Sequence, residues 1–326
     1  MGDIEQIFAG SGKSIFIAAE IGINHNGRVE RAKKLIESAK ECGADAVKFQ
    51  VFRTESFYNK AISPEGHKVF RTYELSYDEF AGLKEFCDDA GILFFATPLD
   101  MESLEFLHKI GSKVVKVASS DLTTEPMLDR IRELGIPAIL STGFAGVDQI
   151  ARAVELTDPK KTALLYCVSK YPAEKNDFDL NFIPKLKKKF GLPVGFSDHS
   201  LDIYFSLAAA ALGASIIERH FTLDNEWEGA DHAISLNPRK FTEMVKALRD
   251  IESALGPGEK KITDFEKKIR DLSMRDTYAR RSIAKGEKIS KDDIALLRPG
   301  SGVSMKDYLS LIGKTADKDI AENEKI

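Results

Sequence analysis

The chain has 326 residues, of which 43% are hydrophobic, and its 47 basic and 51 acidic side chains leave a formal net charge of −4. This composition supports a large core, excludes collagen-like and disordered chains, and offers no basic surface for nucleic acid. The most apolar long window, SLAAAALGASII, is shorter than the roughly 20 residues that a membrane helix needs, so we expect no membrane span. Three cysteines without paired or metal-ligand spacing, and a first segment without the pattern of a signal peptide, favour a cytoplasmic protein.

Eight short apolar runs rich in β-branched or aromatic residues follow one another along the chain, separated by helical patterns of about a dozen residues. The first helical pattern places Ala32, Leu35, Ile36 and Ala39 on one face and ends near Gly43. Repeated strand and helix units of this kind predict an α/β protein with a (β/α)8 TIM barrel rather than a doubly wound sheet. The predicted strands are residues 15–19, 46–50, 92–97, 114–118, 137–141, 162–167, 193–197 and 215–220.

Polar side chains stand at the ends of nearly all of these strands. The active sites of such barrels lie at the carboxyl ends of the strands, while the apolar strand bodies fill the interior. Any one of these residues is equally consistent with an ordinary buried polar group, but the whole set predicts an active site. Its members are Glu20, Lys48, Gln50, Thr97, Lys116, Ser119, Ser141, Ser169, Ser197, His199, Glu218 and His220.

Two lysines within apolar strands need an explanation. A buried lysine persists with an anionic partner or by losing its charge, so Lys48 and Lys116 indicate either an anionic ligand or a Schiff-base nucleophile. The serines and threonine at neighbouring strand ends favour the anion, because their hydroxyls bond phosphate and carboxylate oxygens. His199 and His220 end adjacent strands, and with Asp198 and Glu218 beside them they predict a site for manganese, iron or zinc rather than calcium.

Several stretches, taken in chain order, resemble the sialic acid synthase family. The resemblance covers the whole barrel and continues into the C-terminal region. It implies condensation of phosphoenolpyruvate with an N-acetylated amino sugar such as N-acetylmannosamine, which gives a nine-carbon 2-keto acid and phosphate. The stretches are AEIGINHNG (19–27), AVKFQ (46–50), ATP (96–98), VKVASSDL (115–122), STG (141–143), CVSKYPA (167–173), GFSDHS (195–200) and ERHF (218–221).

The resemblance also implies a role for each residue. His199 and His220 would bind Mn²⁺ or Mg²⁺, which polarises the aldehyde of the open-chain sugar. Glu20, Gln50, Tyr171 and Asp231 would face the sugar, and Glu20 is favoured for proton transfer, ahead of Glu218 and Asp231. Phosphoenolpyruvate would be held by Lys48, Thr97, Lys116, Ser119, Ser141, Ser169 and Ser197.

Two departures from the family pattern leave the acceptor sugar open. Where sialic acid synthases commonly have SGE, this chain has Ser119, Ser120 and Asp121, and Ser169 stands where some members have asparagine. Both positions lie close to the ligands in the family, so Asp121 joins the substrate-binding candidates. The acceptor is therefore N-acetylmannosamine or a related sugar, or the diacetamido-trideoxy hexose that legionaminic and pseudaminic acid synthases use.

The segment after the second predicted strand, residues 51–77, is far longer than the usual connection of two to about six residues in such barrels. Long ordered loops are commonly lids or binding loops. Its six aromatic residues and four basic residues predict a lid that closes over the sugar. The aromatic residues are Phe52, Phe57, Tyr58, Phe70, Tyr73 and Tyr77.

The composition changes near residue 258. We predict a barrel domain over residues 1–258, a charged helical linker over 259–280 and a small, mostly β domain over 281–326. The last domain resembles the antifreeze-like SAF domain of sialic acid synthases. The resemblance implies a domain-swapped homodimer in which Arg298, from an RPG motif, reaches the sugar site of the partner. Two rival hypotheses are a metal-free Schiff-base aldolase that uses Lys48 or Lys116, and a non-catalytic protein that binds acidic sugars.

Overall fold

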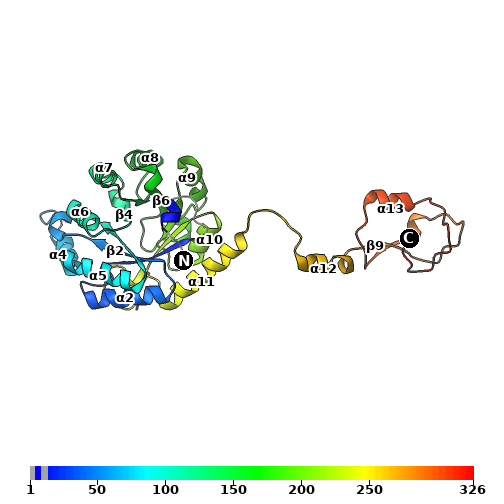
Figure 1. Cartoon of the computed structure of the whole chain (residues 1–326), viewed down its shortest axis with the longest axis horizontal. Coiled ribbons are helices and arrows are strands. Elements are labelled where there is room, and N and C mark those ends of the chain that lie inside the picture. Colours follow the sequence, from blue (N-terminus) through cyan, green and yellow to red (C-terminus); the bar gives the residue numbers. More distant parts are fainter. Residues whose placement is uncertain (1–3, 9–13) are drawn as a thin grey trace. The chain divides into compact units, whose positions relative to one another are not determined.

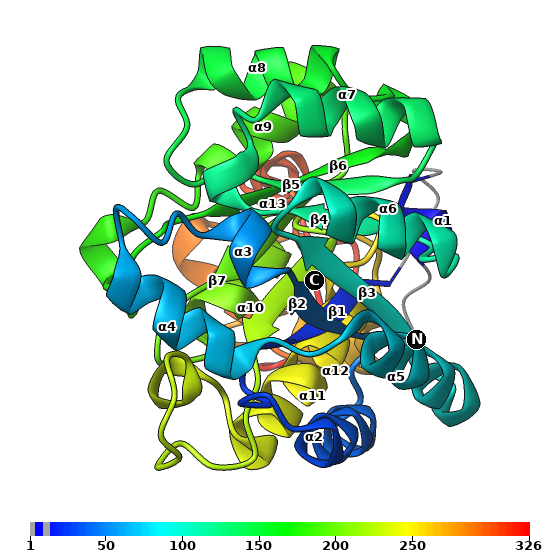
Figure 2. The same ribbon diagram turned by 90° about the vertical axis from the view of Figure 1, so that its left-hand side faces the viewer.

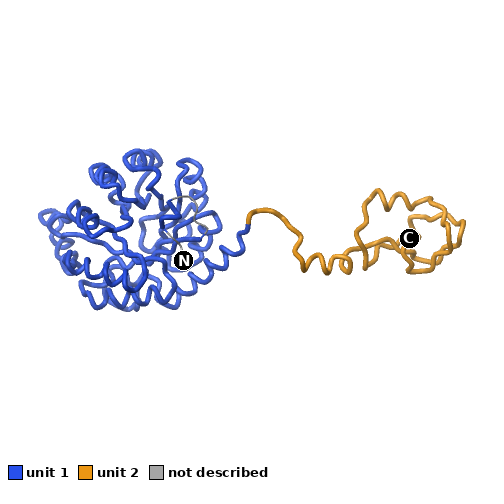
Figure 3. The backbone as a smooth tube through the Cα atoms, in the orientation of Figure 1, with its two compact units in different colours: residues 1–256 blue, residues 257–326 orange. Residues whose placement is uncertain are grey.

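The computed structural model describes residues 4–8 and 14–326 and divides the chain into two compact units, Met1–Gly256 and Pro257–Ile326 (Figure 3). Each unit is described by itself below. Within the described ranges, no helix is both long enough and apolar enough to cross a membrane.

The first unit is a closed barrel of eight parallel strands surrounded by helices (Figures 1 and 2). The strands pair in sequence order, and β1 closes the ring by pairing with β8, which confirms the predicted (β/α)8 barrel. The strands are β1 (Phe16–Gly22), β2 (Ala46–Val51), β3 (Leu93–Pro98), β4 (Val115–Val117), β5 (Ala138–Ser141), β6 (Thr162–Cys167), β7 (Val194–Asp198) and β8 (Ile216–His220).

The helices pack on the outside of the barrel through amphipathic faces. Helix α2 buries Ala32, Leu35, Ile36 and Ala39, the face that the sequence predicts. The helices of this unit are α1 (Ile4–Phe8), α2 (Val29–Glu41), α3 (Thr54–Phe57), α4 (Pro64–Tyr73), α5 (Tyr77–Ala90), α6 (Met101–Lys109), α7 (Glu125–Leu134), α8 (Val147–Glu155), α9 (Phe182–Phe190), α10 (Tyr204–Ala211) and α11 (Pro238–Leu255).

The inside of the barrel changes from apolar to polar along each strand. Side chains two positions apart in a strand share a face, so Phe16 and Ala18 of β1 point the same way as Glu20. Phe16 and Ala18 belong to a buried apolar cluster that also contains Ile4 and Ile7 of α1, while the strand faces that meet the surrounding helices form a separate, larger cluster. Apolar side chains therefore fill the barrel interior at the amino ends of the strands, and its polar side chains lie at the carboxyl ends.

The register of the strands places these polar groups at the same height along the barrel axis. Glu20 of β1 pairs with Lys48 of β2 on one side and with His220 of β8 on the other. Ser197 of β7 pairs with Glu218 of β8. Residues that are distant in the sequence thus become neighbours around the mouth of the barrel.

The long segment after β2 is folded rather than irregular. It forms α3 and α4, and its aromatic side chains pack against one another, with Phe70 contacting Phe52, Phe57, Tyr58 and Tyr73. The segment leads into α5, whose N-cap residue Ser76 forms a capping box and whose C-cap residue Gly91 has a left-handed conformation.

The second unit has a short antiparallel pair, β9 (Asp276–Ala279) and β10 (Ile294–Leu297), preceded by α12 (Asp264–Ser273) and followed by α13 (Met305–Leu311). Further isolated bridges join residues 278 to 325, 283 to 320 and 288 to 315. Its small core contains Ala279, Ile283, Ile289, Ile294, Ala316 and Ile320. This is the small domain of short strands and turns that the sequence predicts.

Candidate active site

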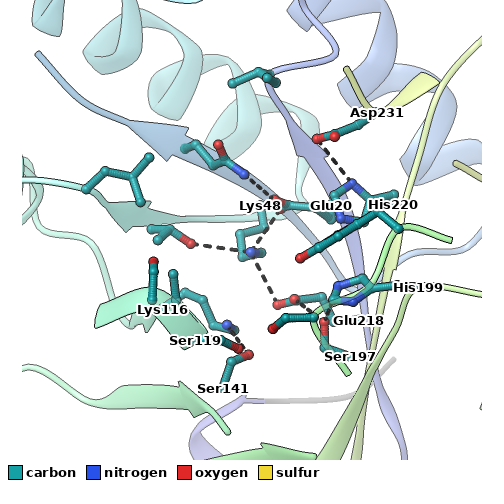
Figure 4. A pocket seen from close by; sticks show the side chains of 18 of the residues that line it. Glu20, Lys48, Lys116, Ser119, Ser141, Ser197, His199, Glu218, His220 and Asp231 are labelled. Atoms are coloured by element: carbon teal, nitrogen blue, oxygen red, sulfur yellow. Dashed lines mark hydrogen bonds and ion pairs between the residues drawn. The ribbon is translucent and has the colours of Figure 1, made fainter. Parts of the chain in front are cut away.

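A cavity of about 310 Å³ opens at the carboxyl ends of the barrel strands (Figure 4). Such a volume lies at the lower end of the range for small-molecule sites. Nearly all of the predicted site residues line it. They are Glu20, Lys48, Gln50, Thr97, Lys116, Ser119, Ser141, Ser169, Tyr171, Ser197, His199, Glu218, His220 and Asp231.

Lys48 is held between two carboxylates. Its Nζ lies 3.2 Å from Glu20 Oε2 and 3.5 Å from Glu218 Oε2, and it donates a hydrogen bond to Thr97 Oγ1 (Figure 4). Burial alone would lower the pKa of Lys48, but Glu20 and Glu218 outweigh it and raise the pKa. Lys48 is therefore a fixed positive charge whose partners are already present.

Lys116 is in a different position. Its Nζ donates to the Ser141 hydroxyl and to the Val117 carbonyl oxygen, and no carboxylate oxygen among the described residues lies within 4.0 Å of it. Burial lowers its pKa, and the charge of Glu218 only partly opposes this effect. Lys116 thus lacks a close anionic partner, which a ligand carrying phosphate or carboxylate would supply.

Hydroxyl groups surround Lys116 on the neighbouring strand ends. Ser119 accepts a hydrogen bond from the backbone N–H of Gly143 at 3.1 Å. A Cβ atom at Gly143 would lie 2.7 Å from Ser119 Oγ and 2.2 Å from Ser169 Oγ, so only glycine lets these side chains approach one another. We call Lys116, Ser119, Ser141, Ser169 and Ser197 the floor of the cavity.

The two buried glutamates have opposite acidities. Burial raises the pKa of Glu20 to about 7, helped by the nearby negative charges of Glu218 and Asp231. Burial would also raise the pKa of Glu218, but Lys116 and Lys48 outweigh it and lower the pKa to about 2. Two carboxyl groups whose pKa values are pushed apart in this way can divide acid and base roles, and Glu20 is the one that exchanges a proton near neutral pH.

The imidazole rings of His199 and His220 line the cavity. His199 Nδ1 donates to the Val168 carbonyl oxygen at 2.7 Å, which leaves the lone pair on Nε2, and His220 Nδ1 is buried without a hydrogen-bond partner. Burial, with like charges nearby, lowers the pKa of His199 to about 4 and that of His220 to about 3, so both rings are neutral at pH 7. Their centroids lie 5.5 Å apart, and Asp231 Oδ2 lies 3.6 Å from His220 Nδ1.

Two neutral imidazoles on adjacent strands fit a divalent transition-metal ion. Throughout residues 4–8 and 14–326, no three His, Cys, Asp or Glu side chains are grouped as a metal site. An ion held by His199 and His220 would therefore take its remaining ligands from substrate and water.

Asp198 does not join this pair, although the sequence places it beside the histidines. Successive strand residues point to opposite faces, so Asp198 and Arg219 point away from the cavity that Ser197 and Glu218 line. Outside the barrel interior, Arg219 Nη1 lies 2.6 Å from Asp198 Oδ2, and both side chains are almost fully buried. The buried pair joins the ends of β7 and β8, next in sequence to the two histidines.

Comparison with known proteins identifies the family. Residues 35–260 match the NeuB family model, and residues 277–326 match the SAF domain model. The chain is 37% identical to N,N'-diacetyllegionaminic acid synthase of Legionella pneumophila, over 96% of this chain and 93% of that protein. It is also 33% identical to human N-acetylneuraminate-9-phosphate synthase, over 95% of this chain and 91% of that protein. The chain belongs to the NeuB family.

A solved structure supports the same assignment. The N-acetylneuraminic acid synthetase of Leptospira borgpetersenii, crystallised with citrate, superimposes with a TM-score of 0.75 at 36% identity, over 79% of this chain and 90% of that chain. The resemblance to sialic acid synthases with a C-terminal SAF domain, predicted from the sequence motifs, is thereby confirmed. In this NeuB protein the matched segment 35–260 contains most of the cavity-lining residues.

Two predicted site residues of the NeuB protein do not line the cavity. Asp121 follows β4 in a short 3-10 turn and accepts a hydrogen bond from Ser120, which does line the cavity. Arg298 follows β10 in the second unit, where its side chain is exposed. Asp121 is therefore next in sequence to a residue of the cavity lining, whereas Arg298 belongs to the second unit, which is described by itself.

The cavity also contains residues that were not among the predicted site residues. Phe57 and Phe70 line it, and the only sequence signal for them was the aromatic content of the long segment after β2. Small or apolar residues that follow strands gave no signal, because their role depends on the folded loops. These are Ile23, Leu99, Ala118, Phe144 and Ala230.

Proposed function

We propose that this NeuB protein condenses phosphoenolpyruvate with an N-acetylated amino sugar of the N-acetylmannosamine type, and releases a nine-carbon 2-keto acid and phosphate. The observation that carries the proposal is that one cavity has two chemically different sides. Its floor offers Lys116 and a set of hydroxyls to an anion, while its other wall offers two neutral histidines and a glutamate of pKa about 7. Two of the relatives are named as synthases of acidic sugars, which supports the proposed condensation.

Phosphoenolpyruvate would bind on the floor. Lys116 would supply the charge that matches its phosphate or carboxylate, and Ser119, Ser141 and Ser169 would donate hydrogen bonds to its oxygens. Lys48 would add positive potential while keeping Glu218 ionised. Because the floor residues lie on strands or within two residues of a strand end, they would hold the enol in a fixed position relative to the aldehyde.

The chemistry that follows requires one group that gives and then takes a proton. As C3 of the enol attacks the aldehyde carbon, protonated Glu20 would give its proton to the aldehyde oxygen, and positive charge would develop at C2. Water would add to C2 and return a proton to Glu20. The hemiketal phosphate would then collapse: the C2–O bond to phosphate breaks, the hydroxyl proton leaves with the phosphate, and a ketone remains.

His199 and His220 would hold a divalent ion, Mn²⁺ or Mg²⁺, which when bound acts as a Lewis acid on the aldehyde oxygen. Titration calorimetry with Mn²⁺ tests this directly. Binding should be lost in His199→Ala and in His220→Ala but kept in His108→Ala, where the histidine is exposed on α6. Unchanged Mn²⁺ binding by the His220→Ala protein would rule out this site.

The second unit would complete the sugar site across a homodimer. We propose that the unit is exchanged between subunits and that Arg298 donates hydrogen bonds to the sugar bound by the partner barrel. Two inactive proteins, Arg298→Ala and His220→Ala, should regain one working site of two when their subunits exchange. No recovery after proven exchange would mean that Arg298 does not act across the dimer. The protein would work in the cytoplasm, where phosphoenolpyruvate is available.

Phosphate release from phosphoenolpyruvate is the central experiment. It should depend on an added amino sugar, tested with N-acetylmannosamine, its 6-phosphate and 2,4-diacetamido-2,4,6-trideoxymannose. No release with any of them would refute the proposed reaction and would favour a binding protein.

The lowered pKa of Lys116 also makes a Schiff-base aldolase a second candidate. Borohydride reduction in the presence of pyruvate distinguishes the two enzymes. Covalent trapping on Lys116, together with activity that resists chelators, would favour the aldolase.

A further inference from the structure

A second cavity, of about 380 Å³, lies beside the start of α2. Its volume is within the range for small-molecule sites. Three segments line it: residues 26–31, which lead into α2, the end of α4 at Thr72 and Tyr73, and residues 227–229, which follow β8 (Figure 2). It shares no lining residue with the active-site cavity, so it is a separate candidate site.

Direct contacts hold these three segments together. Asn26 Nδ2 donates a hydrogen bond to the Glu228 carbonyl oxygen at 2.7 Å, and His232 Nε2 donates to Asn26 Oδ1 at 3.2 Å. Gly27 has a φ of +67°, and a Cβ atom there would overlap the Thr72 carbonyl oxygen, so only glycine fits between the segments. The walls of the second cavity are therefore part of the packed fold.

Two arginines of the second cavity have no anionic partner. The guanidinium carbon of Arg31 lies 4.3 Å from the ring centroid of Trp227, a cation–π contact that holds it in place. Arg28 precedes α2 and is exposed. Among the described residues, no carboxylate oxygen lies within 4.0 Å of either guanidinium, although Glu228 also lines the cavity. Burial, together with the charge of Arg28, lowers the pKa of Arg31. Two neighbouring positive charges are thus left uncompensated.

This combination suits a phosphate group. A guanidinium offers donors in a planar fork that matches phosphate oxygens, and two of them can bond one phosphate from different sides. Helix α2 has 13 residues and no side-chain cap at its start, so the positive end of its dipole adds to the charge of the arginines. Tyr73, which also lines the cavity, carries a further hydroxyl donor.

We propose that the second cavity binds a phosphate group, free or carried by a small organic molecule, through Arg28 and Arg31. The proposal is independent of the condensation proposed for the barrel site, because the two cavities use different residues. A phosphate held there would neutralise the two arginines, which the described residues leave without a carboxylate partner.

The bound phosphate would also join two segments of the active-site mouth. Tyr73 lies three residues after Phe70, and Gly229 lies two residues before Asp231. Phe70 and Asp231 line the active-site cavity, whereas Tyr73 and Gly229 line the second cavity. A ligand that contacts the second cavity therefore stabilises the segments that carry Phe70 and Asp231.

The only tryptophan of the chain, Trp227, reports directly on this cavity. Its fluorescence should change saturably when the protein is titrated with inorganic phosphate or with glucose 6-phosphate at constant ionic strength, and should not change with glucose. Tighter binding of glucose 6-phosphate identifies an esterified phosphate as the ligand, and equal or tighter binding of inorganic phosphate identifies free phosphate. No saturable change with either compound would overturn the proposal.

Variants place the phosphate at the arginines. Arg28→Gln leaves Arg31 against Trp227, so the fluorescence signal is kept, and the Kd for phosphate should rise by about 10- to 100-fold, the usual loss for a charged hydrogen bond. Lys34→Gln is the matched control, since it removes the same charge from the exposed face of α2 outside the cavity lining and should change the Kd by less than about 2-fold. Glu228→Gln removes a like charge and should tighten binding by about 2- to 5-fold.

An unchanged Kd in folded Arg28→Gln, or an equal loss in Lys34→Gln, would overturn the proposal. If Arg28→Gln does not fold, Glu228→Gln decides the question, because only a ligand beside that carboxylate binds more tightly when its charge is removed.

Hydrogen exchange tests the link between the segments. Saturating phosphate should slow backbone amide exchange in residues 64–73 and 227–231 by at least about 3-fold in the wild type, and not in Arg28→Gln at the same concentration. Protection confined to the strand ends around Lys116 would place the phosphate in the active-site cavity and would overturn the proposal. Neither outcome depends on turnover, so a failure here is distinct from a failure of the proposed condensation.

Discussion

The floor and the mouth of the cavity are built in different ways. The floor residues, such as Lys116 and Ser141, lie on strands or within two residues of a strand end, and they are polar and mostly buried. The mouth is formed by residues of the segments that follow the strands, such as Phe57 of α3, Phe144 and Tyr171, and the last two are 78% and 54% exposed. Strands fix the groups that perform the proposed chemistry, whereas loops offer surfaces that can change without disturbing the barrel. In the proposed reaction, residues of the mouth would therefore determine which acceptor sugar is used.

The largest effect should come from breaking the buried ion pair that joins β7 to β8. Arg219→Ala leaves the Asp198 carboxylate buried without its partner, which typically costs about 3 to 5 kcal/mol of unfolding free energy. Denaturant unfolding measures this loss. The double variant Arg219→Gln/Asp198→Asn is the control, because it removes both charges together and should recover part of the loss. A loss below about 1 kcal/mol in Arg219→Ala would mean that solvent or neighbours compensate for the pair.

The next effect concerns the floor. Lys116→Ala should lower kcat/KM for phosphoenolpyruvate by about 10²- to 10³-fold, the usual loss when one well-placed donor to a charged group is removed. The KM for the sugar should change little. Steady-state kinetics with each substrate varied in turn separates the two constants. Equal losses for both substrates would mean that Lys116 is structural and that floor and mouth are not separate binding regions.

The floor could be predicted from the sequence because strands obey a simple rule. Residues two apart share a face, so Lys48 and Gln50 had to point the same way, and the polar ends of parallel strands had to meet at one end of the barrel. The same rule shows why Asp198 was misplaced. It lies between Ser197 and His199 in sequence, yet alternation turns its side chain outward to Arg219. Proximity in sequence suggested a contact that the strand geometry forbids.

The mouth could not be predicted to the same depth. The sequence of residues 51–77 indicates a lid by its length and aromatic content, but six aromatic residues are spread over it and two of them, Phe57 and Phe70, line the cavity. Which rings face the substrate depends on how α3 packs on α4, a tertiary contact without a sequence periodicity. Asp121 shows the converse case, because a position transferred from a family motif lies outside the cavity lining.

A third prediction concerns how the raised pKa of Glu20 affects the stability of the fold. Because burial raises its pKa from 4.5 to about 7, the stability that protonated Glu20 contributes is complete below pH 4.5 and is lost as the pH rises through 7. Glu20→Gln imitates the protonated form, so it should be more stable than the wild type above pH 7, by at most about 3 kcal/mol. The difference should shrink toward zero near pH 4.5.

Thermal unfolding across this pH range measures the difference between the two proteins, and phosphate release shows the accompanying loss of turnover. Gln50→Leu is a suitable control, since it removes a neighbour of Glu20 without changing the charge. If Glu20→Gln is less stable than the wild type at pH 8, the salt bridge to Lys48 stabilises the ionised carboxylate more than burial opposes it.

The smallest effect should come from the mouth, at Tyr171. Its ring lies over His199 with centroids 4.2 Å apart and meets the edge of His220 at 6.0 Å, while more than half of the side chain is exposed. Aromatic pairs of this kind contribute about 0.5 to 1.5 kcal/mol. Tyr171→Ala also admits water to His199, whose pKa is held at about 4 chiefly by burial, so that pKa should rise toward its ordinary value. Tyr171→Phe keeps the ring and should leave the His199 pKa unchanged, as NMR titration of the imidazole in metal-free protein can establish.

For the sugar we expect a loss of kcat/KM of about 2- to 10-fold in Tyr171→Ala, with the KM for phosphoenolpyruvate unaffected. A larger change for phosphoenolpyruvate than for the sugar would contradict the division of the cavity, because a residue at the mouth would then be acting on the ligand of the floor.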